Sequence, residues 1–244
     1  MTGSNIAFIP FRTGSSRLKN KNTLPLADLP LAAWSVVAAN KCLSIDKIIL
    51  STDSKECYKQ IRDSADKVSS LKKDILFDHR SPDHSGSKVK IFDYIKHHLS
   101  TSLVDDSDTL IQLLPTSPFR RVNTLDDALK LYLNSGVGRF AAAEYDFRVS
   151  FAFSIVNDSI KPFFDDCPMI TGNTQSQNHP IMYHPCGVFN IFKMSEARNE
   201  MNTIYDNCKP VIVSREESLD IDTPEDYTFM NSIAYVFKSK LLDL

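Results

Sequence analysis

The chain has 244 residues, of which 42% are hydrophobic and 24% are charged, and its formal net charge is −2. This composition is ordinary for a globular protein and excludes a mostly disordered chain. The small net charge gives no sign of the basic surface that nucleic acid or an anionic membrane attracts. The length suits one large α/β domain, or one domain with a sub-domain, whose core needs no cross-links.

Cysteine spacing and the length of the apolar runs indicate the compartment. The five cysteines are scattered and form no C-x-x-C pair, so neither a disulfide framework nor a zinc knuckle is expected. The longest nearly apolar stretch, residues 29–39, is much shorter than the roughly 20 residues of a membrane span. We therefore expect a soluble, cytoplasmic protein that binds neither membrane nor nucleic acid.

Short apolar runs alternate with helical patterns through the first half of the chain. The runs predict buried strands at 6–9, 46–53, 74–78 and 110–114. The segments that follow them predict helices at 31–42, 54–66, 87–99 and 122–133. This order implies a mainly parallel sheet with helices on both faces. We expect the parallel core to resume at 187–192 and 210–213, and a last helix to begin near Pro224.

The loops that follow the predicted strands are the place to look for chemistry. In sheets of this kind, ligands bind beyond the carboxyl ends of the strands. The loops at residues 10–25, 51–54, 79–88 and 115–121 follow those ends in this sequence. We therefore expect these four loops to share one rim of the sheet.

The region from about residue 139 to 183 differs from the rest. Apolar and small residues alternate between Val149 and Ile155, a period of two that predicts a half-buried antiparallel strand. Phenylalanine is dense between Phe140 and Phe164. This second apolar surface needs a cover. Either a dimer partner or the packing of a β-rich sub-domain on its own sheet would supply one.

The first predicted strand runs into a loop, residues 10–22, that is crowded with cations. Gly14 allows backbone amides to approach an anion, and Ser15 and Ser16 add hydroxyl donors. The loop contains neither a P-loop pattern nor a dinucleotide fingerprint. Composition alone leaves two interpretations, a solvated basic loop or a triphosphate site. The cations are Arg12, Arg17, Lys19 and Lys21.

The spacing within this loop resembles the signature of the CMP-N-acylneuraminate synthetase family, I-P-A-R-x-G-S-K-x-x-x-x-K-N. Matching positions run from Ile9 to Asn22, while Phe11 replaces the usual alanine and Ser16 the usual lysine. Four later segments resemble family motifs in the same order, so the resemblance covers nearly the whole chain. They are S-T-D-S at 51–54, L-L-P-T-S-P-F-R at 113–120, H-P-C-G-V-F at 184–189 and S-L-D-I-D-T-P-E-D at 218–226.

The resemblance implies a Rossmann-like nucleotidyltransferase fold: a single cytidylyltransferase domain over 1–244, carrying an inserted β-rich dimerisation sub-domain at about 139–183. It also implies a homodimer. The implied reaction is attack by the anomeric hydroxyl of a 3-deoxy-2-keto sugar acid on the α-phosphorus of CTP, which releases pyrophosphate and forms a CMP-sugar. Such a transfer depends on positioning and on neutralising charge.

An acidic pair near the end of the chain predicts a metal site. Asp220 and Asp222 are two residues apart, so in extended chain both point to one face. Two neighbouring carboxylates repel unless a cation lies near them, and Mg²⁺ is the usual oxygen-bound ion beside phosphates. The resemblance places the family's metal-binding aspartates here. Glu225 and Asp226 are expected instead to serve the start of the last helix.

The resemblance also assigns the remaining site residues. Arg12, Lys21 and Asp222 are the expected catalytic residues, and Asp220 and Asp222 the expected Mg²⁺ ligands. The expected nucleotide-binding residues are Arg12, Gly14, Ser15, Lys21, Asn22, Arg80 and Ser85.

The sugar-binding positions depart from the family pattern. Leu114 stands where many members carry glutamine, so Gln112, two residues earlier, is the expected substitute, together with Gln177 and His184. The arginine that would hold a sialic acid carboxylate is absent. This argues against N-acetylneuraminate itself and favours a related nonulosonic or octulosonic acid. A nucleotidyltransferase for another NTP or sugar, and a non-catalytic CTP or CMP-sugar binding protein, remain alternatives.

Overall fold

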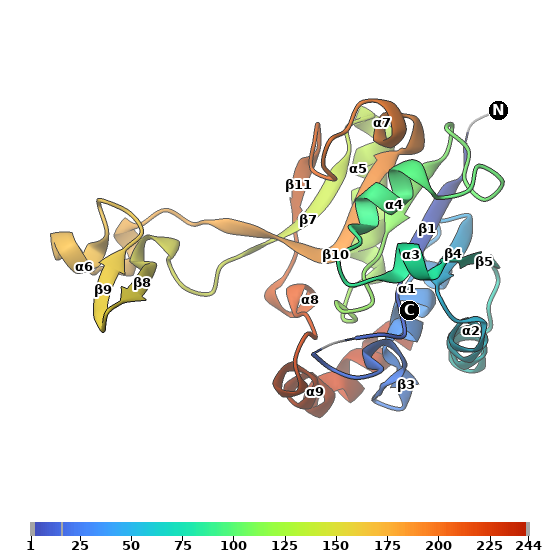
Figure 1. The fold of residues 1–244 in the computed structure, drawn as a ribbon, viewed down its shortest axis with the longest axis horizontal. Coiled ribbons are helices and arrows are strands. Elements are labelled where there is room, and N and C mark those ends of the chain that lie inside the picture. The colour runs from blue at the N-terminus through green and yellow to red at the C-terminus, as the bar shows by residue number, and fades with distance from the viewer. Residues whose placement is uncertain (1–2, 16, 243–244) are drawn as a thin grey trace.

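A computed structural model describes residues 3–15 and 17–242 and shows a central sheet between two layers of helices (Figure 1). The seven strands lie in the order β11-β7-β10-β6-β1-β4-β5. Four of the six pairings are parallel, which confirms the mainly parallel sheet. The strands are β1 (Asn5–Pro10), β4 (Lys47–Thr52), β5 (Asp74–His79), β6 (Thr109–Gln112), β7 (Arg139–Glu144), β10 (Tyr183–Lys193) and β11 (Lys209–Ile212).

The direction of β10 was predicted wrongly. Residues 187–192 do lie in the sheet, but β10 is antiparallel to both β6 and β7. The cause lies in the connection between β7 and β10. The chain leaves the sheet at the end of β7, runs outward and returns beside itself, and strands joined in this way are antiparallel. The strand β11 is parallel to β7, as expected.

The helices divide between the two faces of the sheet. Along β1, Ala7 and Ile9 belong to one buried core and Ile6 and Phe8 to the other, so successive residues serve opposite faces. Residues of α1, α2, α5 and α9 pack in the first core, and residues of α4 and α7 in the second. The helices are α1 (Leu31–Lys41), α2 (Lys55–Ser69), α3 (Pro82–Ser85), α4 (Ile91–His97), α5 (Val122–Ser135), α6 (Pro168–Thr171), α7 (Met194–Asn199), α8 (Arg215–Ser218) and α9 (Pro224–Leu242).

One helix is shorter than predicted, and the last helix begins where it was predicted to begin. The helix expected over 87–99 covers only Ile91–His97, because Gly86 and Lys90 have extended backbone. The last helix begins at Pro224 as expected. Among the described residues, every helix is too short or too polar to cross a membrane.

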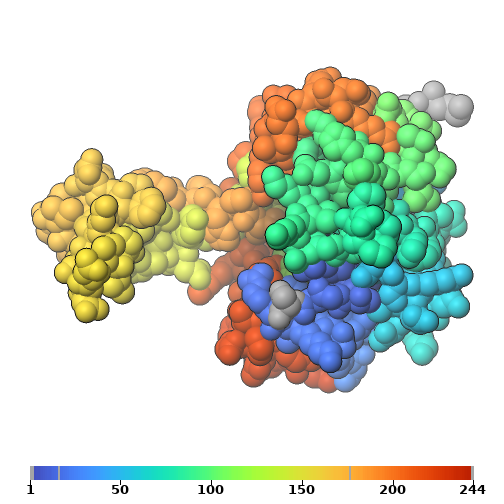
Figure 2. Space-filling view, in the orientation of Figure 1, coloured from blue at the N-terminus to red at the C-terminus, as the bar shows by residue number. Residues whose placement is uncertain are grey.

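An arm between β7 and β10, residues 145–182, projects from the body on a narrow ribbon (Figures 1 and 2). It carries α6, a 3₁₀ turn η3 (Ser176–Asn178) and the hairpin β8 (Phe153–Val156) and β9 (Ser159–Pro162). The strand expected from Val149 starts only at Phe153, since Val149–Phe151 forms a 3₁₀ turn, η2. Asn157 and Asp158 both have positive φ, which suits a tight hairpin turn.

One buried arginine fixes the loop that leaves β6. The guanidinium of Arg120 donates to the backbone oxygens of Val188 (3.0 Å) and Leu114 (2.7 Å) and to the hydroxyl of Ser35. It is 2% exposed, and desolvation lowers its pKa to about 9, so it stays charged at neutral pH. The loop is thereby attached to β10 and α1.

Replacing Arg120 with methionine should lower the free energy of unfolding by about 3 kcal/mol, because buried carbonyl groups lose their donor. Urea unfolding followed by circular dichroism measures this change. The same replacement at the neighbouring, exposed Arg121 is the control and should change stability by less than about 0.5 kcal/mol. Equal effects of the two substitutions would contradict the anchoring role of Arg120.

Candidate active site

A pocket of about 280 Å³ opens beyond the carboxyl ends of β1 and β6. Three of the four predicted rim loops contribute to its wall, and the fourth, at 51–54, contacts the first through Asp53. The prediction that these loops share one rim is therefore confirmed. The lining residues are Pro10, Phe11, Arg12, Lys21, Asn22, Arg80, Gly86, Ser87, Val89, Ile91, Leu114, Pro115 and Thr116.

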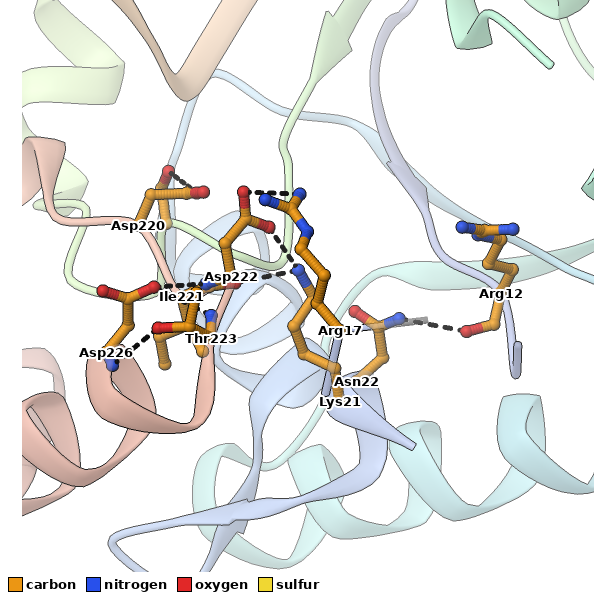
Figure 3. A network of polar contacts seen from close by, with 10 residues as sticks. Arg12, Arg17, Lys21, Asn22, Asp220, Ile221, Asp222, Thr223 and Asp226 are labelled. Atoms are coloured by element: carbon orange, nitrogen blue, oxygen red, sulfur yellow. Dashed lines mark hydrogen bonds and ion pairs between the residues drawn. The ribbon is translucent and has the colours of Figure 1, made fainter. Parts of the chain in front are cut away.

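The cationic loop and the acidic segment meet beside this pocket (Figure 3). The Lys21 ammonium group lies 2.8 Å from Oδ1 of Asp222 and donates a second bond, also 2.8 Å, to the backbone oxygen of Ile221. Arg17 approaches the other carboxylate oxygen of Asp222, again at 2.8 Å. Segments about 200 residues apart in sequence thus form one polar cluster.

A hydrogen bond between Asn22 and Arg12 joins the end of the cationic loop to its start. The side-chain amide of Asn22 donates to the backbone oxygen of Arg12 at 3.1 Å, and Asn22 is buried. The Arg12 guanidinium stands apart from the cluster around Asp222 in Figure 3, and Arg12 lines the pocket. Gly14 and Ser15 lie between the two ends, and Ser16 falls outside the described residues.

Asp53 positions the start of the loop. Its carboxylate accepts from the backbone N–H of Thr13 (2.9 Å) and from the Thr13 hydroxyl (2.9 Å). Burial alone would raise the pKa of Asp53, but the bonds from Thr13 outweigh burial and hold it below its ordinary value. The carboxylate is therefore ionised at neutral pH, and as a charged acceptor it holds Thr13 in place.

Arg80 supplies an unmatched buried donor. One end of its guanidinium donates to the backbone oxygens of Phe11 and Ser51, the latter at 3.3 Å, and desolvation lowers its pKa. Its Nε–H group is buried and has no acceptor among the described residues. Because such a group costs about 1–3 kcal/mol, a ligand acceptor in the pocket is its natural partner. Ser85 instead turns away, donating to the Ser81 backbone oxygen at 2.5 Å.

The two aspartates of the acidic pair have different surroundings. Ser117 donates to Oδ1 of Asp220 at 3.2 Å. Although Asp220 retains accessible surface, protein atoms crowd its carboxylate, and this desolvation, together with the charge of Asp222, raises its pKa. Asp226 accepts from the backbone N–H groups of Asp222 and Thr223, so it orders the start of α9, as expected.

The donor set fits a metal that also binds substrate. The described residues contain no cluster of three or more histidine, cysteine, aspartate or glutamate side chains. A cage built from protein ligands alone is therefore missing from that part of the chain. Mg²⁺ commonly binds one or two carboxylates and completes its octahedron with phosphate oxygens and water. Desolvation is the main cause that raises the pKa of Asp220, and the charge of Asp222 adds to it; a dication beside the two carboxylates would relieve that added repulsion.

The three expected sugar-binding residues do not line the pocket. Gln112 lies on β6 two residues before Leu114, and its Oε1 atom is buried without a donor. Gln177 is exposed on the arm, and His184 lies at the base of the arm, where its ring contacts Tyr145 at 4.8 Å. The structure therefore brings together the cationic loop, Asn22, Arg80 and the acidic pair. It does not bring the three expected sugar-binding residues to the same pocket.

Sequence reasoning missed three positioning residues, Asp53, Ser117 and Arg120. All three lie within motifs that were recognised, S-T-D-S and L-L-P-T-S-P-F-R, so the signal was present without a role. Asp53 holds the cationic loop, and Ser117 contacts Asp220. Arg120 anchors the loop after β6, which carries Ser117.

Comparison with known proteins agrees with this geometry. The model of the cytidylyltransferase family matches residues 6–150. The chain therefore belongs to this family of nucleotidyltransferases, as the motifs predicted.

Relatives and solved structures refine the comparison. The chain is 30% identical to an N-acylneuraminate cytidylyltransferase of Escherichia coli O18:K1:H7 over 98% of its own length, but spans only 54% of that protein. It is 29% identical to a CMP-N,N'-diacetyllegionaminic acid synthase of Legionella pneumophila, with 93% of this chain and 95% of the relative covered. A solved CMP:2-keto-3-deoxy-manno-octonic acid synthetase complexed with CTP shares the fold, with a TM-score of 0.64 at 13% identity over 96% and 99% of the two chains.

Replacing Asp53 with asparagine should weaken CTP binding about tenfold, because Thr13 exchanges a charged acceptor for a neutral one. Isothermal titration calorimetry with CTP measures the affinity. The exposed Asp63, which pairs with Arg62, is the control, and Asp63→Asn should bind CTP like the parent. Parent-like affinity in Asp53→Asn would show that the loop does not depend on this carboxylate.

Proposed function

We propose that this protein transfers CMP from CTP to the anomeric hydroxyl of a 3-deoxy-2-keto sugar acid and releases pyrophosphate. One observation carries the proposal: Arg12 and Lys21 of the first loop line one pocket together with Arg80, whose Nε–H is buried and unmatched, and Lys21 also pairs with Asp222. The relatives named for N-acylneuraminate, legionaminic acid and pseudaminic acid support the acceptor class. The five unpaired thiols fit a cytoplasmic location.

In this proposal, Arg12 and Lys21 bind phosphate oxygens and neutralise the charge that grows as the bond to pyrophosphate breaks. Gly14 and Ser15 bring backbone amides toward the same oxygens. Arg80 and Asn22 contact the nucleoside. The Nε–H of Arg80 donates to a carbonyl oxygen or ring nitrogen of cytosine. The oxygen of the sugar hydroxyl bonds to the α-phosphorus as the bond to pyrophosphate breaks, and the hydroxyl proton passes to solvent water.

Asp220 and Asp222 would hold Mg²⁺ together with the phosphates. The ion, when bound, neutralises phosphate charge and makes the attacking hydroxyl easier to deprotonate. In the structure, Lys21 and Arg17 pair with the two oxygens of Asp222. These cations must therefore exchange the carboxylate for phosphate oxygens when CTP binds, so metal and nucleotide binding should reinforce one another.

The Asp222→Asn variant tests this exchange. In the parent, Mg²⁺ should raise CTP affinity at least tenfold, whereas Asp222→Asn removes both a proposed metal ligand and the charge that pairs with Lys21 and Arg17, so the gain should nearly vanish. Calorimetric titration of CTP with and without Mg²⁺ gives both affinities, apart from any turnover. Glu225→Gln, an exposed neighbour, is the control. A full Mg²⁺ gain in Asp222→Asn would contradict the exchange.

Activity itself is tested by pyrophosphate release over a panel of keto-sugar acids, with mass detection of the CMP-sugar. Arg12→Ala should lower kcat/KM about 10²–10³-fold, because it removes one charged transition-state donor. Arg62→Ala, on an exposed face of α2, is the control and should leave the rate unchanged. CTP binding without product from any acceptor would favour a binding protein, and equal binding of ATP or UTP would favour another nucleotidyltransferase.

We further propose that the arm forms the homodimer contact. Its hairpin and flanking turns expose large apolar side chains that a monomer would leave in water, and the space-filling view shows the arm standing clear of the body (Figure 2). A symmetric dimer would cover the same patch on both copies. The exposed residues include Phe147, Phe153, Ile155, Val156, Ile160, Phe163, Met169 and Ile170.

Phe163 is 76% exposed, and Phe163→Asp should convert the protein from dimer to monomer because it places a charge in the apolar contact. Analytical ultracentrifugation should give twice the chain mass of 27.5 kDa for the parent and the single mass for the variant. Leu43→Asp, at an even more exposed position on the body, should remain dimeric. A monomeric parent would overturn the arm interface.

A further inference from the structure

A buried carboxylate lies two residues before Arg80. Asp78, near the carboxyl end of β5, is the register partner of Ser51 on β4, so the two side chains share one face of the sheet. Asp78 is buried, and it accepts from the Ser51 hydroxyl at 2.6 Å and from the Tyr94 hydroxyl at 2.9 and 2.8 Å. Tyr94 reaches Asp78 from α4, which covers that face. The proposed reaction makes no use of this carboxylate.

The donors that surround Asp78 are hydroxyl groups and carry no charge. Within residues 3–15 and 17–242, Asp78 forms no ion pair with a lysine, arginine or histidine side chain. Desolvation, with the charge and hydrogen bond of Asp78, raises the pKa of the Tyr94 hydroxyl, which therefore stays protonated and remains a donor. A buried carboxylate is costly unless a positive charge balances it, so a cation is expected nearby.

Arg80 is connected to Asp78 by two routes. The Ser51 hydroxyl donates to Asp78, and the backbone oxygen of Ser51 accepts from the Arg80 guanidinium at 3.3 Å. The Cζ atom of Arg80 also lies 5.8 Å from the centre of the Tyr94 ring, and the hydroxyl of that ring donates to Asp78. The ring face attracts the guanidinium charge. Ser51 and Tyr94 therefore hold the carboxylate and the guanidinium in one buried network.

The charge of Asp78 complements that of Arg80. Arg80 is 5% exposed, and desolvation lowers its pKa, while the charges of Asp53 and Asp78 act against this shift. The backbone of Arg80 is fixed as well, because its N–H donates to the backbone oxygen of Thr52 at 3.0 Å. Arg80 lines the active-site pocket, and its Nε–H is buried without an acceptor in the described part of the chain. The network thus fixes a charged donor group whose remaining N–H awaits a ligand.

We propose that Asp78 is a positioning residue for recognition of the nucleobase. Acting through Ser51 and Tyr94, it holds the guanidinium of Arg80 so that the Nε–H group faces the base. A guanidinium offers donors only. Cytosine presents two neighbouring acceptors, O2 and N3, whereas uracil carries a donor, N3–H, in place of the second. A fixed Arg80 therefore favours CTP over UTP. This inference rests on the proposed function, in which Arg80 contacts the base.

The ratio of the UTP and CTP dissociation constants measures this role, because both nucleotides carry the same ribose and triphosphate. Isothermal titration calorimetry in the presence of Mg²⁺ gives both constants. Asp78→Asn keeps the shape of the side chain and removes its charge, so the preference for CTP should fall about tenfold. Asp83→Asn, at an exposed carboxylate on α3, is the control and should keep the preference of the parent. An unchanged preference in Asp78→Asn would overturn the positioning role.

Tyr94→Phe tests the same network without removing a charge. It keeps the ring beside Arg80 and removes the hydroxyl that donates to Asp78, so the preference for CTP should fall several-fold. Circular dichroism and thermal unfolding show which variants are folded, and Tyr94→Phe decides the question where Asp78→Asn does not fold. A folded Tyr94→Phe protein with the preference of the parent would contradict the network.

A double-mutant cycle shows whether Asp78 acts through Arg80. Arg80→Ala alone should remove most of the preference for CTP, and adding Asp78→Asn should then lower it no further. A further fall would place the effect of Asp78 elsewhere and refute the inference. A parent protein that binds CTP and UTP equally would overturn the role of Arg80 in the proposed function. A preference for CTP that survives in Asp78→Asn and Tyr94→Phe would overturn this inference alone.

Discussion

The ion pair between Lys21 and Asp222 is the contact on which the site depends. It joins the first loop of the chain to the segment before its last helix, and Lys21 is buried, so the contact is not a loose surface pair. The second bond of Lys21, to the backbone oxygen of Ile221, fixes the position of the acidic segment as well as its charge. A charged loop and a carboxylate pair would each repel themselves in isolation, and together they neutralise one another.

That arrangement balances the charges of the site within the protein itself, because the aspartates face a lysine and an arginine. In the reaction that we propose, CTP brings several negative charges and a metal brings two positive ones. Each charged side chain would then exchange one charged partner for another, which limits the desolvation cost of binding.

Much of the body and of the nucleotide side could be predicted from sequence. Strand β1 is a short apolar run that ends at Pro10, and the family motif from Ile9 to Asn22 runs through the loop after it. The direction of β10 could not be predicted, because pairing depends on the path of the arm and not on local pattern. The role of Arg120 was hidden for a similar reason. An arginine is usually exposed. Only the fold shows that hydrogen-bond acceptors from three segments surround the guanidinium of Arg120.

The acceptor side resisted prediction for a different physical reason. The residues that we propose bind the nucleotide lie on loops anchored to the sheet, where Asp53, Ser117 and Arg120 hold them in place. Gln177 lies instead on an arm that has little core of its own, and His184 lies at its base. A motif match places residues along the chain, but it places them in space only where the fold between them is fixed. The body of the chain therefore positions the residues that we propose bind the nucleotide. The position of the arm decides whether Gln177 lies near the proposed sugar-binding part of the site.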